Sequence, residues 1–148
     1  MSERQEAAMV SKDRDRTLTL LAWCIAMAAT LGALFIGEVM GQMPCTLCWY
    51  QRIAMFPLAL LLGVAAFRDD GRIWLYALPM SLIGLLVAGY HSLLLAGIMS
   101  APIVPCQENG PSCSGEAMLI AGVPIPYLST AAFAAITLLL LPTTRKSA

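Results

Sequence analysis

The sequence predicts an all-α integral membrane protein in which four helices form a bundle and both termini lie in the cytoplasm. Composition is the first reason: 59% of the 148 residues are hydrophobic and 12% are charged, and the mean hydropathy is +0.75. Such values are typical of a chain that resides in lipid. The second reason is that four separate apolar stretches approach the roughly 20 residues needed to cross a hydrocarbon layer of about 30 Å. The third is the distribution of basic residues.

The first span is predicted at residues 18–40, after a polar leader at residues 1–16. Within it, Ala26-Met27-Ala28 has the small-x-small form of a signal-peptide processing site. Cleavage there would leave a half-length remnant, because the apolar run continues well past this point. We therefore expect an uncleaved first span.

The remaining spans follow from the same hydropathy pattern, and we expect a single membrane domain over residues 1–148. A hydrophilic turn at 68–72 separates the second span from the third. Two further loops carry cysteines and contain no basic residue. The predicted spans are 49–67, 73–98 and 127–141, and the two cysteine-bearing loops are 41–48 and 99–126.

Eight of the nine Lys and Arg residues fall in the leader, in the 68–72 turn and in the C-terminal tail. The positive-inside rule therefore places these segments in the cytoplasm and both cysteine-bearing loops outside. The net charge is zero, and no basic patch interleaved with aromatic residues occurs. A nucleic-acid partner is not expected.

The cysteines indicate redox chemistry, because Cys45 and Cys48 lie in the first outer loop and Cys106 and Cys113 in the second. Thiols outside the cytosol tend to oxidise, so two dithiols at one membrane face suggest electron transfer. Structural disulfides or a zinc site are the alternatives. A Cys-x-x-Cys disulfide closes too small a loop to restrict the unfolded chain much, and six residues separate the second pair, which is unusual for zinc ligands. Disulfide exchange without a metal is favoured.

Helix-end physics distinguishes Cys48 from Cys45. Pro44 interrupts the preceding structure, so Cys48 is expected in the first turn of the second span, where the helix dipole stabilises an anion by roughly 0.3 to 1 kcal/mol. Arg52 lies one turn further on the same face and would add to thiolate stabilisation. A snorkelling side chain is the alternative for Arg52. A charge at membrane depth costs about 2.5 to 3.5 kcal/mol on insertion scales, which favours a function.

His91 and Glu38 are predicted at the same height as Arg52. His91 lies 18 residues beyond Ile73, which is about 27 Å at 1.5 Å per residue. A satisfied bundle histidine and a carboxylate at the water boundary are the simpler alternatives. Together with Arg52 these groups predict a site beside Cys48 for a polar head group on a lipid-soluble tail. Cys24, in the inner half of the first span, is given no catalytic role.

One nine-residue motif resembles a known family. The segment Pro44-Cys45-Thr46-Leu47-Cys48-Trp49-Tyr50-Gln51-Arg52 is similar to the signature of the bacterial disulfide bond formation protein B family, including its BdbC-type members. These are four-helix thiol:quinone oxidoreductases of the cytoplasmic membrane. Weaker similarities occur in Gly89-Tyr90-His91, Pro105-Cys106 and the segment 125–129.

The resemblance implies an electron relay that reoxidises a thioredoxin-fold thiol oxidase of the DsbA/BdbD type. The reduced partner attacks the disulfide of Cys106 and Cys113 at Cys106, and Cys113 then attacks Cys45. Cys48, released as a thiolate, passes electrons to a membrane quinone, either ubiquinone or menaquinone. Arg52 and His91 are the implied quinone-binding residues. The implied location is the bacterial cytoplasmic membrane, with lipid as the surrounding partner and the redox cysteines on the extracytoplasmic side.

Two departures from the family pattern and two alternatives accompany this resemblance. The second cysteine pair is closer together than in the best-known members, as in BdbC-type proteins, and Gln51 stands where some relatives have an acidic residue. A quinone-epoxide reductase of the vitamin K type also combines Cys-x-x-Cys with loop cysteines, but there the loop pair precedes the motif. The other alternative is a non-enzymatic membrane protein with structural or metal-binding cysteines.

Overall fold

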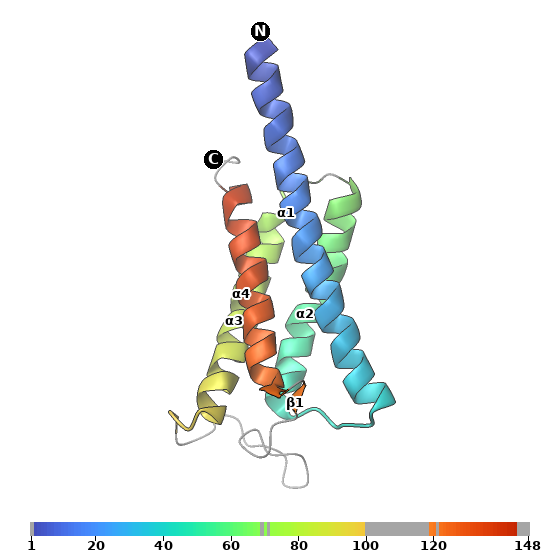
Figure 1. Cartoon of the computed structure of the whole chain (residues 1–148), viewed down its shortest axis with the longest axis vertical. Coiled ribbons are helices and arrows are strands. Elements are labelled where there is room, and N and C mark those ends of the chain that lie inside the picture. Colours follow the sequence, from blue (N-terminus) through green and yellow to red (C-terminus); the bar gives the residue numbers. More distant parts are fainter. Residues whose placement is uncertain (1, 69, 71, 100–118, 121, 145–148) are drawn as a thin grey trace.

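The structure is a computed structural model that describes residues 2–68, 70, 72–99, 119, 120 and 122–144. Its long elements are four helices, and each is long and apolar enough to cross a membrane. This confirms the predicted all-α membrane class (Figure 1). The elements are α1 (Ser2–Leu34), the π-helix η1 (Phe35–Val39), α2 (Thr46–Arg68), α3 (Trp74–Leu95), β1 (Leu119–Ile120), β2 (Val123–Pro124) and α4 (Ile125–Thr144). The two short strands pair antiparallel directly before α4.

The helix limits differ from the predicted spans in ways that local chemistry explains. The polar leader is helical and continuous with the first span, since its Glu, Arg, Lys and Ala residues favour helix. α3 ends at Leu95 instead of residue 98 because Gly97 adopts a left-handed conformation with φ 71°. The N–H groups of Gly97 and Ile98 then bond to the carbonyls of Leu94 and Leu93, at 3.1 and 3.2 Å, and close the helix end.

α4 begins two residues before the predicted span and continues three residues beyond it, through Pro142 to Thr144. Proline lacks an N–H, which removes one helical hydrogen bond. In the last turn this loss affects a single bond, so the helix continues past the ring instead of stopping before it.

Each helix packs against two neighbours, because α1 contacts α2 and α4, and α3 contacts the same two helices. Large apolar side chains fill the centre, and α2 and α4 provide most of them. The largest fully buried ones are Phe133, Leu58, Leu62, Ile136 and Leu140. Gly84 allows α3 to approach α4, since a Cβ atom there would overlap the ring of Phe133.

Hydroxyl groups join α3 to α4 at two depths. The Ser92 and Thr130 hydroxyls lie 2.8 Å apart, and the Thr137 hydroxyl donates to Ser81 Oγ at 3.1 Å. Such bonds matter in a bundle without a hydrophobic driving force between its helices. They fix the helix that carries His91 against α4.

The α1–α2 connection lies at the same end of the bundle as the C-terminal end of α3 and the β1–β2 pair, while the start of α1, the end of α2, the start of α3 and the end of α4 lie at the other end (Figure 1). The α1–α2 connection, which carries Cys45, and the described ends of the segment that carries the second cysteine pair therefore lie at one end of the bundle. Cys106 and Cys113 themselves lie outside the described residues.

Candidate functional site

The first cysteine pair forms the start of α2. Non-helical residues precede Cys45, and the helix begins at Thr46, so Cys48 lies in the first turn as predicted. The Cys45 carbonyl accepts the first helical hydrogen bond from Trp49 N at 3.0 Å. Its sulfur accepts a bond from Cys48 N at 3.4 Å, as an N-cap side chain does. The cap holds both sulfurs at one helix end.

Both cysteines are thiols and lie in contact, with 3.0 Å between the Sγ atoms. Cys45 donates to Cys48. The pKa of the Cys45 thiol is raised to about 12, first by its hydrogen bond to Cys48 and then by burial, while the bond from His91 acts in the opposite direction. Cys45 therefore keeps its proton at neutral pH, and the Cys48 sulfur accepts the hydrogen bond between the two residues.

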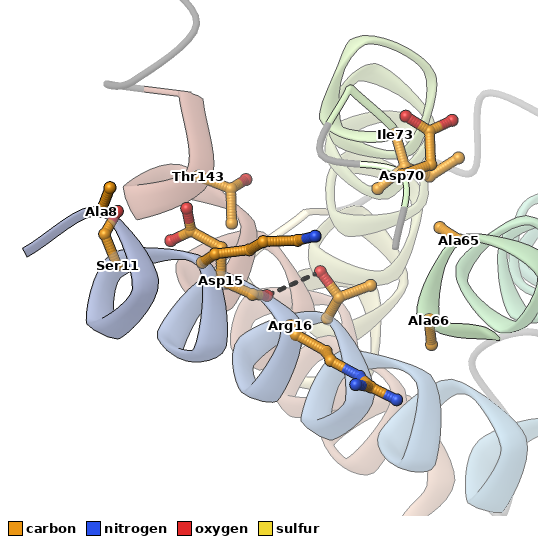
Figure 2. A pocket seen from close by; sticks show the side chains of 11 residues that line it. Ala8, Ser11, Asp15, Arg16, Ala65, Ala66, Asp70, Ile73 and Thr143 are labelled. Carbon is orange, nitrogen blue, oxygen red and sulfur yellow. Dashed lines mark hydrogen bonds between the residues drawn. The ribbon is translucent and has the colours of Figure 1, made fainter. Parts of the chain in front are cut away.

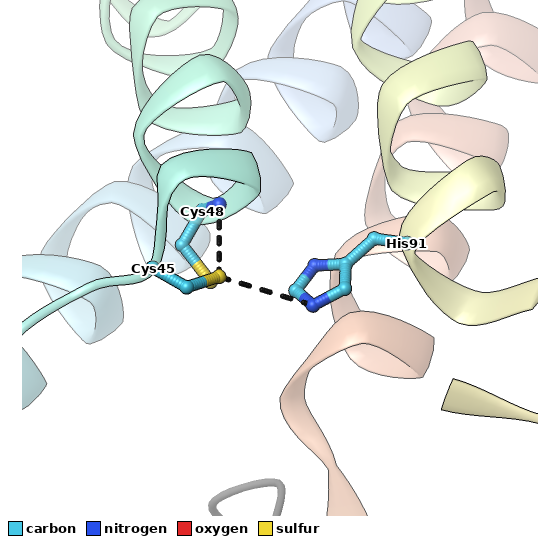
Figure 3. A group of neighbouring side chains, drawn as sticks. All are labelled: Cys45, Cys48 and His91. Atoms are coloured by element: carbon cyan, nitrogen blue, oxygen red, sulfur yellow. Dashed lines mark hydrogen bonds between the residues drawn. The ribbon is translucent and has the colours of Figure 1, made fainter. Parts of the chain in front are cut away.

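His91 lies beside the thiol pair, at the height that the residue count predicts (Figure 3). It projects from α3, its side chain is 4% exposed, and its Nε2 is 3.9 Å from Cys45 Sγ. Its Nδ1 is 3.0 Å from the amide nitrogen of Gln51, which is also buried on α2. The imidazole thus contacts the thiol pair on one side and the Gln51 amide on the other.

Sequence reasoning did not assign a role to Gln51. A signal was present, because an amide near the start of an apolar helix requires a buried partner. The chain has a single histidine, predicted at the same depth on another span. Depth alone could not show that these two side chains face each other.

Arg52 occupies the opposite, α1-facing side of α2. Its Nη2 donates to the carbonyl of Ala33 at 2.8 Å, and its guanidinium carbon lies 5.6 Å from the ring centre of Trp49. The guanidinium also lies close against Gly37 in η1. The cation is therefore held against the backbone of α1, one helical turn from Cys48, and does not extend freely to the membrane surface.

Glu38 does not join the predicted group. Its side chain is exposed, and it forms no ion pair within the described part of the chain. The reason is rotational, because the π-helical turn directs Gly37 toward Arg52. Sequence spacing set the height of Glu38 correctly, but its side chain points elsewhere.

The thiols and the imidazole are close enough to share a soft cation. The sulfurs of Cys45 and Cys48 and a ring nitrogen of His91 all lie within 4.8 Å of one another. A structural zinc site normally has four ligands, and the described residues supply three. This arrangement makes metal content a necessary control in functional experiments.

A cavity of about 220 Å³ lies at the opposite end of the bundle, between α1, the end of α2 and the end of α4 (Figure 2). Its lining includes Lys12, Asp15, Arg16 and Asp70 but no sulfur atom. The Thr19 hydroxyl donates to the Asp15 carbonyl at 3.0 Å along its wall. This cavity is remote from the thiol pair and offers no redox group.

The comparison with known proteins points to one family. The family description "Disulfide bond formation protein DsbB" matches residues 15–142. A probable disulfide formation protein of Metapseudomonas resinovorans is 51% identical over 131 residues, which cover 88% of this chain and 91% of the relative. Disulfide bond formation protein C of Bacillus subtilis (strain 168) is 41% identical over 122 residues, covering 81% and 88%.

A probable disulfide formation protein of Chlamydia pneumoniae is 40% identical over 122 residues, covering 82% of this chain and 88% of the relative. No solved structure matches the chain significantly. The matched region includes the second and third spans, most of the first and fourth, and the Cys45–Cys48 motif. The chain belongs to the disulfide bond formation protein DsbB family, and it is a membrane-embedded oxidoreductase that forms disulfides.

Proposed function

We propose that this protein is a thiol:quinone oxidoreductase that reoxidises a thioredoxin-fold thiol oxidase of the DsbA/BdbD type and passes the electrons to ubiquinone or menaquinone. One observation carries the proposal. The thiol pair is polarised, with Cys45 donating to Cys48 at the start of α2, while the Arg52 cation lies one turn below Cys48.

The first half of the proposed reaction is disulfide exchange. The partner dithiol reduces the disulfide of Cys106 and Cys113, beginning with attack on Cys106, and leaves as the oxidised partner. The Cys113 thiolate then attacks Cys45 of the Cys45–Cys48 disulfide and expels the Cys48 thiolate. Attack by Cys106 on Cys113 reforms the loop disulfide and releases Cys45, which takes up a proton. Two electrons have then moved from the partner to the first pair, in which Cys45 is a protonated thiol and Cys48 a thiolate, and the second proton of the partner dithiol has been released.

The structure supports Cys48 as the sulfur that leaves. A leaving thiol departs faster when its thiolate is stabilised. Cys48 lies in the first turn of α2, where the helix dipole favours an anion, and it accepts the hydrogen bond from Cys45. Cys45 holds its proton strongly, so the two sulfurs have different roles in the same exchange.

The second half is transfer to a quinone, which when bound supplies the two-electron acceptor. The residues present fit a quinone head group. Arg52 makes one hydrogen bond to protein within the described residues, and a guanidinium has five N–H donors. Trp49, beside it, is 53% exposed and offers a flat apolar surface. We assign Arg52 to holding a quinone oxygen, and His91 to donating from Nε2.

The proposed orientation places Cys45, Cys48, Cys106 and Cys113 on the extracytoplasmic side of the bacterial cytoplasmic membrane, with both termini inside. The end of the bundle that carries the chain ends also carries Arg16, Lys12 and Arg72. The two cysteine-bearing segments, residues 41–48 and 99–126, contain no basic residue. This charge asymmetry favours the proposed orientation.

The competing function is metal binding without catalysis, and the cluster of Cys45, Cys48 and His91 is the observation that favours it. The deciding experiment uses the purified full-length protein with a reduced DsbA-type donor and either ubiquinone or menaquinone. We expect donor-dependent quinone reduction, followed by absorbance, in protein that has been stripped of metal. Stoichiometric zinc with no donor-dependent quinone reduction would contradict the proposed quinone chemistry and favour metal binding by this cluster.

A further inference from the structure

The contacts around His91 form a chain of hydrogen bonds in which each group donates to the next, from Gln51 toward Cys48. The amide nitrogen of Gln51 has only donors, so at 3.0 Å it requires His91 Nδ1 to be the acceptor. The single proton of a neutral imidazole then belongs on Nε2, which faces Cys45 Sγ. Cys45 in turn donates to Cys48.

We propose that Gln51 is a positioning residue that fixes neutral His91 in the tautomer protonated at Nε2, so that the imidazole donates to Cys45 and the chain of donors ends at Cys48. The tautomer itself does not depend on the proposed function, whereas its effect on turnover rests on it.

Burial makes the contact of Gln51 with His91 decisive for the tautomer. Gln51 is 7% exposed and His91 is 4% exposed, so water does not compete freely for either group. A buried polar atom left without its partner is strongly destabilising, and this penalty selects one tautomer. Hydrogen bonds in series also polarise one another at low dielectric.

An acidic residue at position 51 would reverse the chain. A carboxylate has only acceptors, so it requires a proton on Nδ1. Nε2 of a neutral imidazole then becomes an acceptor, and the Cys45 thiol finds an acceptor in His91 as well as in Cys48. Cys45 then no longer donates to Cys48 alone. The neutral amide of Gln51 thus determines the direction of hydrogen-bond donation between His91 and Cys45.

The test uses nitrogen-15 NMR on the reduced full-length protein labelled at histidine. Because the chain contains one histidine, the two ring-nitrogen signals need no assignment by mutation. We expect Nδ1 to show the chemical shift of an unprotonated nitrogen and Nε2 that of a protonated one. A proton on Nδ1 in the unmodified protein would overturn the proposal.

Two variants and one control strengthen the test. Gln51→Glu, with its carboxylate ionised, is expected to place the proton on Nδ1, and Gln51→Met, which has neither donor nor strong acceptor, to give a mixture of tautomers. The control is Tyr50→Phe, which removes a polar atom from a neighbouring side chain that is 45% exposed, and it should leave both signals unchanged. A spectrum of Gln51→Glu identical to that of the unmodified protein would overturn the proposal.

The kinetic consequence is a slower turnover, with a smaller effect on quinone binding. We expect Gln51→Met to lower kcat by about fivefold, the loss of one hydrogen bond of ordinary strength, with a smaller change in the KM for quinone. A rise in KM without a fall in kcat would place Gln51 in the quinone site and contradict a positioning role. Should the protein prove inactive with every quinone, the NMR result still decides the tautomer and only the proposed function fails.

Discussion

The first two turns of α2 present two chemically different faces to the rest of the bundle. The face toward α3 is buried and formally neutral, with Gln51 bonded to His91 and His91 beside Cys45. The face toward α1 carries the Arg52 cation, which bonds to the Ala33 carbonyl and lies beside the exposed ring of Trp49.

This difference assigns two tasks to two faces. The α3 face controls where protons sit on the thiol pair, through a network that excludes water. The α1 face is half-open and charged, as a site for an electron-accepting head group requires. Cys48 is the point at which the two faces meet, because it accepts from Cys45 and lies one turn above Arg52.

Loss of Cys48 should have the largest effect, since it breaks the connection between the faces. We predict that Cys48→Ser reduces donor-dependent quinone reduction to the uncatalysed rate, because the variant cannot form the first disulfide. The control is Cys24→Ser, which removes an exposed thiol from α1 and should retain full activity. Substantial turnover by Cys48→Ser would remove this cysteine pair from the pathway.

Arg52→Ala tests the charged face alone. We predict that the KM for quinone rises by about 10- to 150-fold, the range for losing a hydrogen bond to a charged group, while disulfide exchange with the partner keeps its rate. Arg52→Lys retains the charge without the planar guanidinium. Its KM for quinone should lie between that of the unmodified protein and that of Arg52→Ala. Unchanged quinone kinetics in Arg52→Ala would show that the head group binds elsewhere.

Gly84→Leu tests whether the neutral face depends on the close approach of α3 to α4. The added side chain overlaps the Phe133 ring, and overpacking of this kind costs about 1–3 kcal/mol. We predict a lower melting temperature in detergent, measured by circular dichroism. Gly89→Ala is the matched control, since nothing lies within 4 Å of a Cβ atom there. Equal melting temperatures for both variants would contradict the packing described here.

The protonation of Cys45 provides a smaller and more local test. Its pKa of about 12 is raised chiefly by Cys48, so Cys48→Ala should lower that pKa and let Cys45 react with iodoacetamide at a lower pH. Cys48→Ser retains an oxygen acceptor and should give a smaller decrease. The rate of Cys45 alkylation against pH, followed by mass spectrometry, measures both. If the pH midpoint of Cys45 alkylation were higher in Cys48→Ala than in the unmodified protein, the assignment of Cys45 as donor would be contradicted.

The smallest effect is expected for the hydroxyl pair that supports α3 just beyond His91. A double-mutant cycle with Ser92→Ala and Thr130→Val should give a coupling energy of about 0.6 kcal/mol, a typical value for such bonds in membrane bundles. Denaturation in mixed detergent provides the measurement. No coupling would mean that apolar packing alone fixes this end of α3.

Much of the fold was predictable because hydropathy and residue count determine which segments cross a membrane and how deep each residue lies. Pro44 correctly placed Cys48 in the first turn of a helix. Counting from Ile73 placed His91 at the height of the thiol pair. The fold class and the depth of the site in the membrane therefore follow from hydropathy and residue counting alone.

Rotation about each helix axis was not predictable in the same way. The contact of Gln51 with His91 and that of Arg52 with Ala33 depend on how the helices pack. The π-helical turn at Phe35–Val39 contains Glu38, and hydropathy does not predict such a turn. For this reason Glu38 was predicted at the right depth, but its side chain is exposed and does not join Arg52 and His91.

The length of α1 has a practical consequence for mapping orientation. Its 33 residues extend for about 50 Å at 1.5 Å per residue, roughly 20 Å more than a hydrocarbon layer. In Figure 1 the excess projects beyond the other helices at the end remote from the cysteines. A fluorophore attached near Ser2 would thus stand clear of both the lipid surface and the neighbouring helices, where a water-soluble quencher added to one compartment reports its side directly.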